Sequence, residues 1–283
     1  HPRMGATDVC PIVPVKNISI EECVELSKKL AKKVAEFLNI PIYMYEYSAK
    51  EEYRRNLANI RSGEYEGFED KIKDKKWAPD YGPAKFNLPS GVTAIGVRDF
   101  LIAFNVNLNT SNKKIASDIA LDIREKGRAK RDSNNKILRN KKGEIIKVPG
   151  TLKSVKAVGW YIDEYKQAQV SMNLVNYKVT SMHKAFEEVR KQASIRGLRV
   201  TGSEIVGLIP KQSIVSSGEY FLKKQNSSIS IPEEDIIANA VQSLGLNDLS
   251  NFEPRKIIIE EALNKNVESF SNWRIKEFMD EVS

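Results

Sequence analysis

The sequence has few of the residues on which metal and cofactor chemistry most often depends. Its 283 residues include 2 cysteines and 2 histidines, and Cys10 and Cys23 do not have the spacing of a metal site. We therefore expect no disulfide framework, no structural zinc site and no metal cofactor. Such a chain is typical of the reducing cytoplasm, and we predict a cytoplasmic protein.

Long apolar runs and phosphate-binding glycine motifs are also missing from the sequence. No run approaches the roughly 18 residues of a spanning helix, and no charged-then-apolar signal region opens the chain, so we expect neither a membrane protein nor a secreted one. Neither G-x-G-x-x-G nor a P-loop occurs, which removes most support for nucleotide-dependent chemistry. We also find no internal repeat.

Positive charge is what the sequence has in excess. There are 45 Lys and Arg against 37 Asp and Glu, a net charge of +8, in a chain of ordinary globular composition. The cations gather in and around residues 130–147, where turn signals predict a protruding β-hairpin. The charge therefore indicates an anionic ligand or partner, or a solvated hairpin.

The first hundred residues alternate apolar strands with charged helical stretches. Ser19 and Glu22 form a capping box ahead of a helix that runs to Asn39, and a second helix is predicted over 49–60. Residues 77–91 contain three prolines and two glycines, which excludes a helix or a central strand. A loop of this length is usually a binding loop or a linker, and its three aromatic side chains favour packing on the domain or on a ligand.

The remainder of the chain predicts a ferredoxin-like unit. Over 100–209 the order is strand, helix, strand, strand, helix, strand, which places two helices on one face of a four-stranded sheet. Extra helices are expected further on, near 233–244, 255–264 and 271–281. We predict an α/β (α+β) protein of two α/β subdomains, residues 1–98 and 99–283.

A basic ferredoxin-like sheet raises an RNA-binding interpretation. RNA-recognition sheets carry an aromatic signature on a central strand, and residues 156–162 do not match it. We therefore disfavour a nucleic-acid partner, since a solvated hairpin or an anionic small molecule explains the charge at least as well. His183, at the start of the helix predicted over 181–196, is more simply a partly exposed polar residue than a functional one.

Seven segments together resemble the glutamate formimidoyltransferases, including the transferase half of formimidoyltransferase-cyclodeaminase. In family order, over nearly the whole chain, they are His1–Pro11, Ile60–Glu66, Trp77–Pro83, Phe100–Leu108, Val158–Tyr161, Gln169–Leu174 and Gly202–Pro210. The resemblance implies transfer of a formimidoyl group between N5 of tetrahydrofolate and the amine of L-glutamate, in histidine degradation and one-carbon metabolism. Tetrahydrofolate is then a substrate or product, and the small-molecule partners are folate and L-glutamate or N-formimidoyl-L-glutamate.

The resemblance also implies the site residues. The family's catalytic histidine falls on His1, which would act as a base of pKa about 6.5 toward the glutamate amine. The family's folate-binding loop falls on the Pro- and Gly-rich segment, namely Gly82, Pro83, Ala84, Lys85, Phe86, Asn87, Leu88, Pro89, Ser90 and Gly91. The folate is expected to lie between the two subdomains, and Trp77, Tyr81 or Phe86 would either stack near its pterin or pack in the protein.

The sequence departs from the family in two ways and leaves alternatives open. The family extends upstream of its histidine, so we expect an incomplete first subdomain here, and residues 131–148 contain extra sequence relative to the animal enzymes. Formyl transfer from 5-formyltetrahydrofolate to glutamate is one alternative function. A non-enzymatic, basic nucleic-acid-binding module is another. The oligomeric state stays open, with a homodimer among the alternatives.

Overall fold

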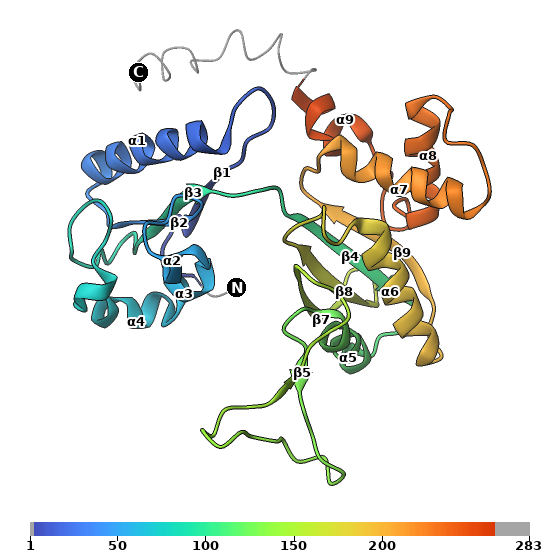
Figure 1. The fold of residues 1–283 in the computed structure, drawn as a ribbon, viewed down its shortest axis with the longest axis horizontal. Coiled ribbons are helices and arrows are strands. Elements are labelled where there is room, and N and C mark those ends of the chain that lie inside the picture. The colour runs from blue at the N-terminus through green and yellow to red at the C-terminus, as the bar shows by residue number, and fades with distance from the viewer. Residues whose placement is uncertain (1–2, 264–283) are drawn as a thin grey trace. The chain divides into compact units, whose positions relative to one another are not determined.

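The computed structural model describes residues 3–263 of the chain. The described residues divide into two compact units, an N-terminal unit up to Asp99 and a C-terminal unit from Phe100 (Figure 1). Each unit is α/β, which confirms the predicted fold class. Among the described residues no helix is both long and apolar enough to cross a membrane.

The N-terminal unit is a parallel three-stranded sheet covered on both faces. Its strands are paired in the order β1-β3-β2, with β3 in the centre. Their bounds are Val9–Ile12 for β1, Ile42–Glu46 for β2 and Thr93–Val97 for β3. Helix α1 (Ile20–Leu38) covers one face, and the short helices α2 (Glu52–Arg55), α3 (Leu57–Arg61) and α4 (Glu64–Lys71) lie on the other (Figure 1).

The alternation of side chains along β2 explains why both faces are covered. Ile42 and Met44 pack with Ala31 and Ala35 of α1, whereas Tyr43 and Tyr45 point into the opposite core. These four residues of the strand are buried, as is typical of a strand in a sheet with helices on both sides.

Helix α1 follows the predicted capping signals. The Glu22 amide donates to Ser19 Oγ at 3.1 Å and the Ser19 amide donates to Glu22 Oε2 at 2.8 Å. Asn39 ends the helix in the left-handed conformation at φ 52°. The predicted helix over 49–60 is wrong as one element, because Asn56 interrupts it with an extended backbone and caps α3 through its side chain.

The C-terminal unit confirms the predicted β-α-β-β-α-β order. Its antiparallel sheet pairs in the order β7-β8-β4-β9, with helices α5 and α6 against one face. The bounds are β4 Ile102–Leu108, α5 Lys113–Ile123, β7 Val155–Ile162, β8 Gln167–Leu174, α6 Met182–Ile195 and β9 Val200–Val206. A single apolar core fills the space between the sheet and these helices.

Within residues 3–263, three labelled helices follow the sheet. They are α7 Lys211–Lys224, α8 Glu233–Leu244 and α9 Pro254–Ile257. Helix α8 confirms the prediction over 233–244, whereas α7 is not among the predicted elements. The helix expected near 255–264 is represented by α9 and by helical residues 259–263, which are separated from α9 by Ile258, and the one expected near 271–281 lies outside the described residues.

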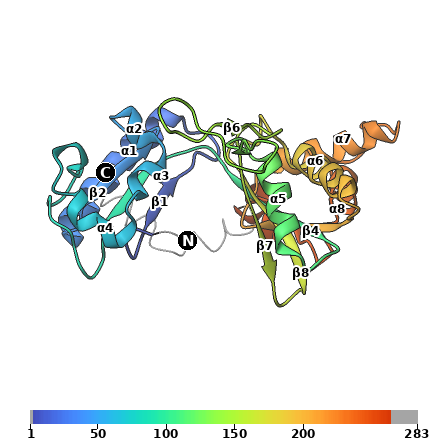
Figure 2. The same ribbon diagram turned by 90° about the horizontal axis from the view of Figure 1, so that it is seen from below.

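The predicted hairpin is present and extends from this unit. Strands β5 (Arg128–Ala129) and β6 (Lys147–Val148) form its base. Figure 1 shows it reaching beyond the sheet and helices of the unit, and Figure 2 views it from below. We call residues 128–148 the prong, with a first loop at 132–136 and a second loop at 140–144.

Candidate functional site

The structure brings the N-terminal motif beside the predicted folate-binding loop. Gly5 and Gly91 form an antiparallel bridge, the Val92 amide donates to the carbonyl of Met4 at 3.0 Å, and the Ala6 amide donates to Ser90 at 2.9 Å. Two segments almost ninety residues apart in the chain are thus joined through their backbones. His1, three residues before Met4 in the chain, lies outside the described residues.

Glycine is required on both sides of this contact. Gly91 has a φ of 66°, and a Cβ atom there would overlap the carbonyl oxygen of Met4. A Cβ atom on Gly5 would likewise overlap the carbonyl oxygen of Val92. Only two residues without side chains allow the backbones to approach this closely.

A second motif fixes the same N-terminal segment from the side. The Met4 amide donates to Asp8 Oδ1 at 3.0 Å, and Asp8 forms an ion pair with Arg61 from the end of α3. Asp8 is largely buried, which strengthens its charged contacts relative to a surface pair. Thr93 Oγ1 completes the anchoring by donating to the carbonyl of Thr7 at 2.6 Å.

The folate-loop candidate is anchored at its middle and end. Phe86 is buried, with its ring centroid 5.0 Å from that of Tyr65, and the Tyr65 hydroxyl donates to the carbonyl of Leu88. The amides of Ser90 and Gly91 donate to the side chain and the carbonyl of Asn87, at 3.0 and 2.6 Å. Phe86 therefore packs in the protein core.

The rest of the loop is left accessible by these anchors. Leu88 is 67% exposed, and four other loop residues are exposed, namely Gly82, Ala84, Lys85 and Pro89. Pro83 is half-buried. The loop thus presents one cation and a short apolar tip on an otherwise rigid frame.

The other two aromatic residues of the segment are held within the N-terminal unit. Trp77 meets the Tyr53 ring edge-on at a centroid distance of 5.3 Å, and Lys71 Nζ lies 3.9 Å from the centroid of the Trp77 ring. Tyr81 packs beside the α1 core, and its carbonyl accepts from the Ile42 amide at 2.9 Å.

Polar side chains from four strands meet on the sheet face opposite α5 and α6, a site that the sequence analysis missed. Gln169 Nε2 donates to Asn107 Oδ1 at 2.7 Å, and Trp160 Nε1 donates to Gln169 Oε1 at 2.9 Å. Asn107 Nδ2 in turn donates to Asp248 at 2.8 Å. Asn107 and Gln169 are both 0% exposed, so these hydrogen bonds satisfy polar groups that are buried in the sheet.

The same face carries a carboxylate. Asn105, two residues before Asn107 on β4, donates to Glu204 Oε2 of β9 at 3.2 Å. The side chains come from four of the segments that carried the family resemblance. The available signal was the pair of asparagines alternating with apolar residues in Phe104–Leu108, since amides in a buried strand need polar partners.

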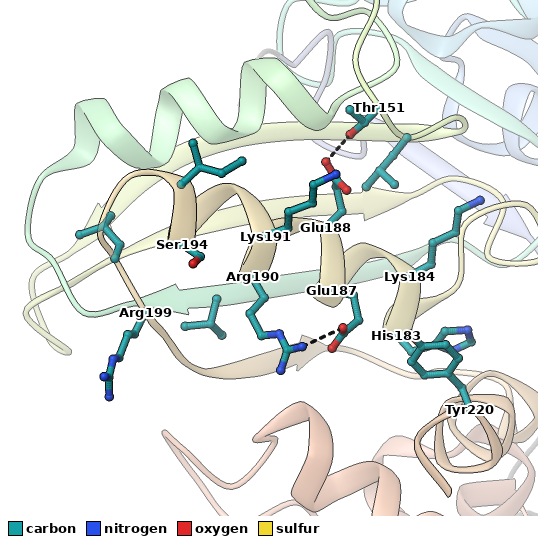
Figure 3. Close-up of a pocket in the computed structure, with 14 residues that line it drawn as sticks. Thr151, His183, Lys184, Glu187, Glu188, Arg190, Lys191, Ser194, Arg199 and Tyr220 are labelled. Carbon is teal, nitrogen blue, oxygen red and sulfur yellow. Dashed lines mark hydrogen bonds and ion pairs between the residues drawn. The ribbon is translucent and has the colours of Figure 1, made fainter. Parts of the chain in front are cut away.

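A cavity lies elsewhere in the C-terminal unit, along α6 (Figure 3). It has a volume of about 1040 Å³, and Figure 3 shows His183 and Tyr220 at one end and Arg199 at the other. None of the predicted site residues lines it. Ion pairs and hydrogen bonds within the protein already engage its carboxylates: Glu187 with Arg190, and Glu188 with Thr151.

His183 is integrated in the packing of this region. Its ring stacks on Tyr220 at 4.4 Å, and its two nitrogens lie 2.8 Å from Ser181 Oγ and 3.3 Å from Ser217 Oγ. Burial lowers the pKa of His183 to about 4, so the ring is neutral at pH 7. These contacts favour a structural role.

No cluster of three or more His, Cys, Asp or Glu side chains within residues 3–263 could hold a metal ion. Burial raises the thiol pKa of both Cys10 and Cys23, which disfavours thiolate chemistry at either residue.

Comparison with known proteins covers both units. Residues 1–98 match the model of the formiminotransferase domain, N-terminal subdomain, and residues 103–264 match that of the formiminotransferase domain. The chain is 45% identical to formimidoyltransferase-cyclodeaminase of Dictyostelium discoideum over 94% of its length, and 42% identical to that of Mus musculus over 92%. It spans 46% and 45% of those two proteins. It is also 42% identical to glutamate formimidoyltransferase of Streptococcus pyogenes, over 80% of this chain and 68% of that protein.

Proposed function

Because this chain belongs to the formiminotransferase domain family, we propose that it moves a formimidoyl group between N5 of tetrahydrofolate and the amine of L-glutamate. The names of the similar proteins favour this reaction over formyl transfer and over a non-enzymatic nucleic-acid-binding module. The observation that carries the proposal is the backbone pairing of Met4–Ala6 with Ser90–Val92. It joins the segment that follows His1 to the loop assigned to folate.

In the proposed mechanism His1 is the base. The glutamate amine is protonated at neutral pH and must lose a proton before its lone pair can attack the formimidoyl carbon. Neutral His1 takes that proton, and the free amine then attacks the formimidoyl carbon and forms the new C–N bond of a tetrahedral intermediate. The bond from this carbon to N5 then breaks, and the imidazolium returns its proton to N5 of the leaving tetrahydrofolate.

The proposed folate contact is the exposed part of the loop. Lys85 supplies a cation for a folate carboxylate, and Leu88 and Pro89 offer apolar surface to the pterin or the aminobenzoyl ring. The rigid turn at Asn87–Gly91 lowers the entropy lost when a ligand binds. We further propose that Glu204 and Asn105, on the polar sheet face, contact a substrate.

The test uses the full-length protein with 5-formimidoyltetrahydrofolate and glutamate, and follows release of tetrahydrofolate. A positioned base contributes about 10²–10⁴-fold to rate, so His1→Ala should reduce turnover at least about a hundredfold. His183→Ala is the matched control, since it removes the other histidine of the chain, and should retain most of the activity. Unchanged turnover in His1→Ala would overturn the assignment of the base.

A further inference from the structure

The first loop of the prong is a self-supporting turn. Asp132 Oδ1 accepts from the amides of Asn134 and Lys136, both at 2.9 Å. Asn135 adopts a positive φ of 63°, and Arg131 donates to its carbonyl at 2.6 Å. The loop is therefore closed by its own polar groups, without an apolar core.

The second loop repeats this architecture eight residues later. Asn140 Oδ1 accepts from the amides of Lys142 and Glu144, at 2.9 and 3.0 Å. Gly143 has a φ of 80°, and Arg139 donates to its carbonyl at 2.7 Å. The expectation of no internal repeat is wrong for these two loops. The repeat is not evident from the sequence because the loops share their hydrogen bonds more than their residue identities.

The two loops are joined by a ring of three backbone hydrogen bonds. The Lys130 amide donates to Ile146 at 2.7 Å, the Ile146 amide to Leu138 at 3.0 Å and the Leu138 amide to Lys130 at 2.9 Å. These residues are also spaced by eight. The prong is thus a rigid support for the side chains it presents.

Many of those side chains are cations, and most of the cations form no ion pair within the described chain. Residues 128–148 hold eight Lys and Arg against two acidic residues, a local excess of six in a chain of net charge +8. Five of them are exposed lysines with no ion pair to any residue of the described chain, namely Lys130, Lys136, Lys141, Lys142 and Lys147. Ion pairs within the described chain therefore do not account for these five lysines.

We propose that the prong binds the phosphate backbone of a duplex nucleic acid, as a function separate from the transferase reaction. Lysines that neutralise phosphates release condensed counterions, which drives binding without any need for sequence recognition. Residues 128–148 contain no aromatic side chain on which unpaired bases could stack, which favours a duplex contacted through its phosphates over a single strand. This surface is the prong, not the ferredoxin-like sheet that the sequence analysis tested for RNA recognition.

Two other anionic partners fit the prong less well. Its exposed apolar residues, Ile145, Ile146 and Val148, lie in β6 or just before it and not in the two loops, which is unsuited to insertion into an anionic bilayer. The loops also lack the aromatic or apolar anchors on which protein interfaces depend.

The test measures fluorescence anisotropy of two labelled 20-base-pair duplexes of unrelated sequence. The protein should bind both with equal affinity. Neutralising about five phosphates predicts a loss of affinity of roughly 500-fold between about 50 and about 200 mM salt. Changing the five prong lysines to Gln should abolish binding and leave the melting temperature and transferase activity unchanged.

A matched control removes the same charge elsewhere. Lys16, Lys29, Lys50, Lys178 and Lys223 are exposed and lie outside the prong, and their joint change to Gln should preserve duplex binding. The proposal is overturned if the wild-type protein does not bind duplexes, if the two five-lysine variants bind alike, or if the prong lysines are needed only for binding phosphatidylserine vesicles.

Discussion

At the scale of single residues, Gly91 joins the Met4–Ala6 segment to the predicted folate-binding loop. Gly91→Ala should destabilise the protein by about 2–4 kcal/mol, because the left-handed backbone and the overlap with Met4 both oppose a methyl group. Gly197→Ala is the control, since Gly197 has a similar φ of 72° but no atom near a new Cβ. It should lose only about 1 kcal/mol in urea unfolding. Equal losses of stability in the two variants would show that the contact between Gly91 and Met4 leaves room for a methyl group.

His183 gives the protein a defined pH response. Its pKa is about 4 in the folded state and about 6.5 when unfolded, so the unfolded chain binds more protons between these values. Stability should therefore fall as the pH drops from about 6.5 toward 4, with no contribution above about 7. His183→Asn lacks this titrating group. The difference in free energy of unfolding between the wild type and this variant, measured with denaturant, should therefore be constant above about pH 6.5 and change below it. A difference that is constant down to pH 4.5 would contradict the neutral, buried ring.

At the scale of elements, the polar chain across β7, β8 and β4 can be tested by removing its central amide. Asn107→Ala removes the acceptor of the buried Gln169 Nε2 and one of the donors to Asp248, and should cost about 2–3 kcal/mol. Asn173→Ala, an exposed amide on β8, should change stability by less than about 0.5 kcal/mol. An equal loss of stability in the two variants would contradict the stabilising role of the Asn107 amide.

The elements that could be predicted are those specified by short-range signals. Ser19 and Glu22 mark the start of α1, and the apolar alternation marks the strands of the C-terminal unit. Helix α7 was missed because its buried residues include two serines and a glycine, and the close packing of Gly218 on Ile236 of α8 is what makes them suitable. Such tertiary contacts have no local signature.

The candidate site shows the same limit. Its loop could be located from Pro, Gly and aromatic composition, because that composition excludes regular structure. The pairing of Gly5 with Gly91 could not be located, since two isolated glycines far apart in the chain give no sign of their contact. The repeat of the two prong loops could not be predicted for a related reason. Asp132 and Asn140 are different residue types, but each side chain accepts a hydrogen bond from the backbone amide four residues later.

At the scale of the whole molecule, the two units have separate apolar cores. Every residue of the C-terminal core follows Phe100, and those of the other two cores precede it. We expect two unfolding transitions in denaturant. With Trp273 changed to Phe, fluorescence of Trp77 alone or Trp160 alone, obtained by changing the other to Phe, should report different midpoints. Coincident transitions would show that the units unfold as one.

The position of β3 in its sheet has a consequence for how the site comes into existence. Among the strands of the described residues, β1 and β2 each pair with β3, which is the last of the three in the chain. During synthesis β1 and β2 therefore have no partner strand in this sheet until residues 93–97 have left the ribosome. The same event that closes the sheet carries Ser90–Val92 to Met4–Ala6, so a nascent chain acquires its sheet and its proposed catalytic geometry in one step.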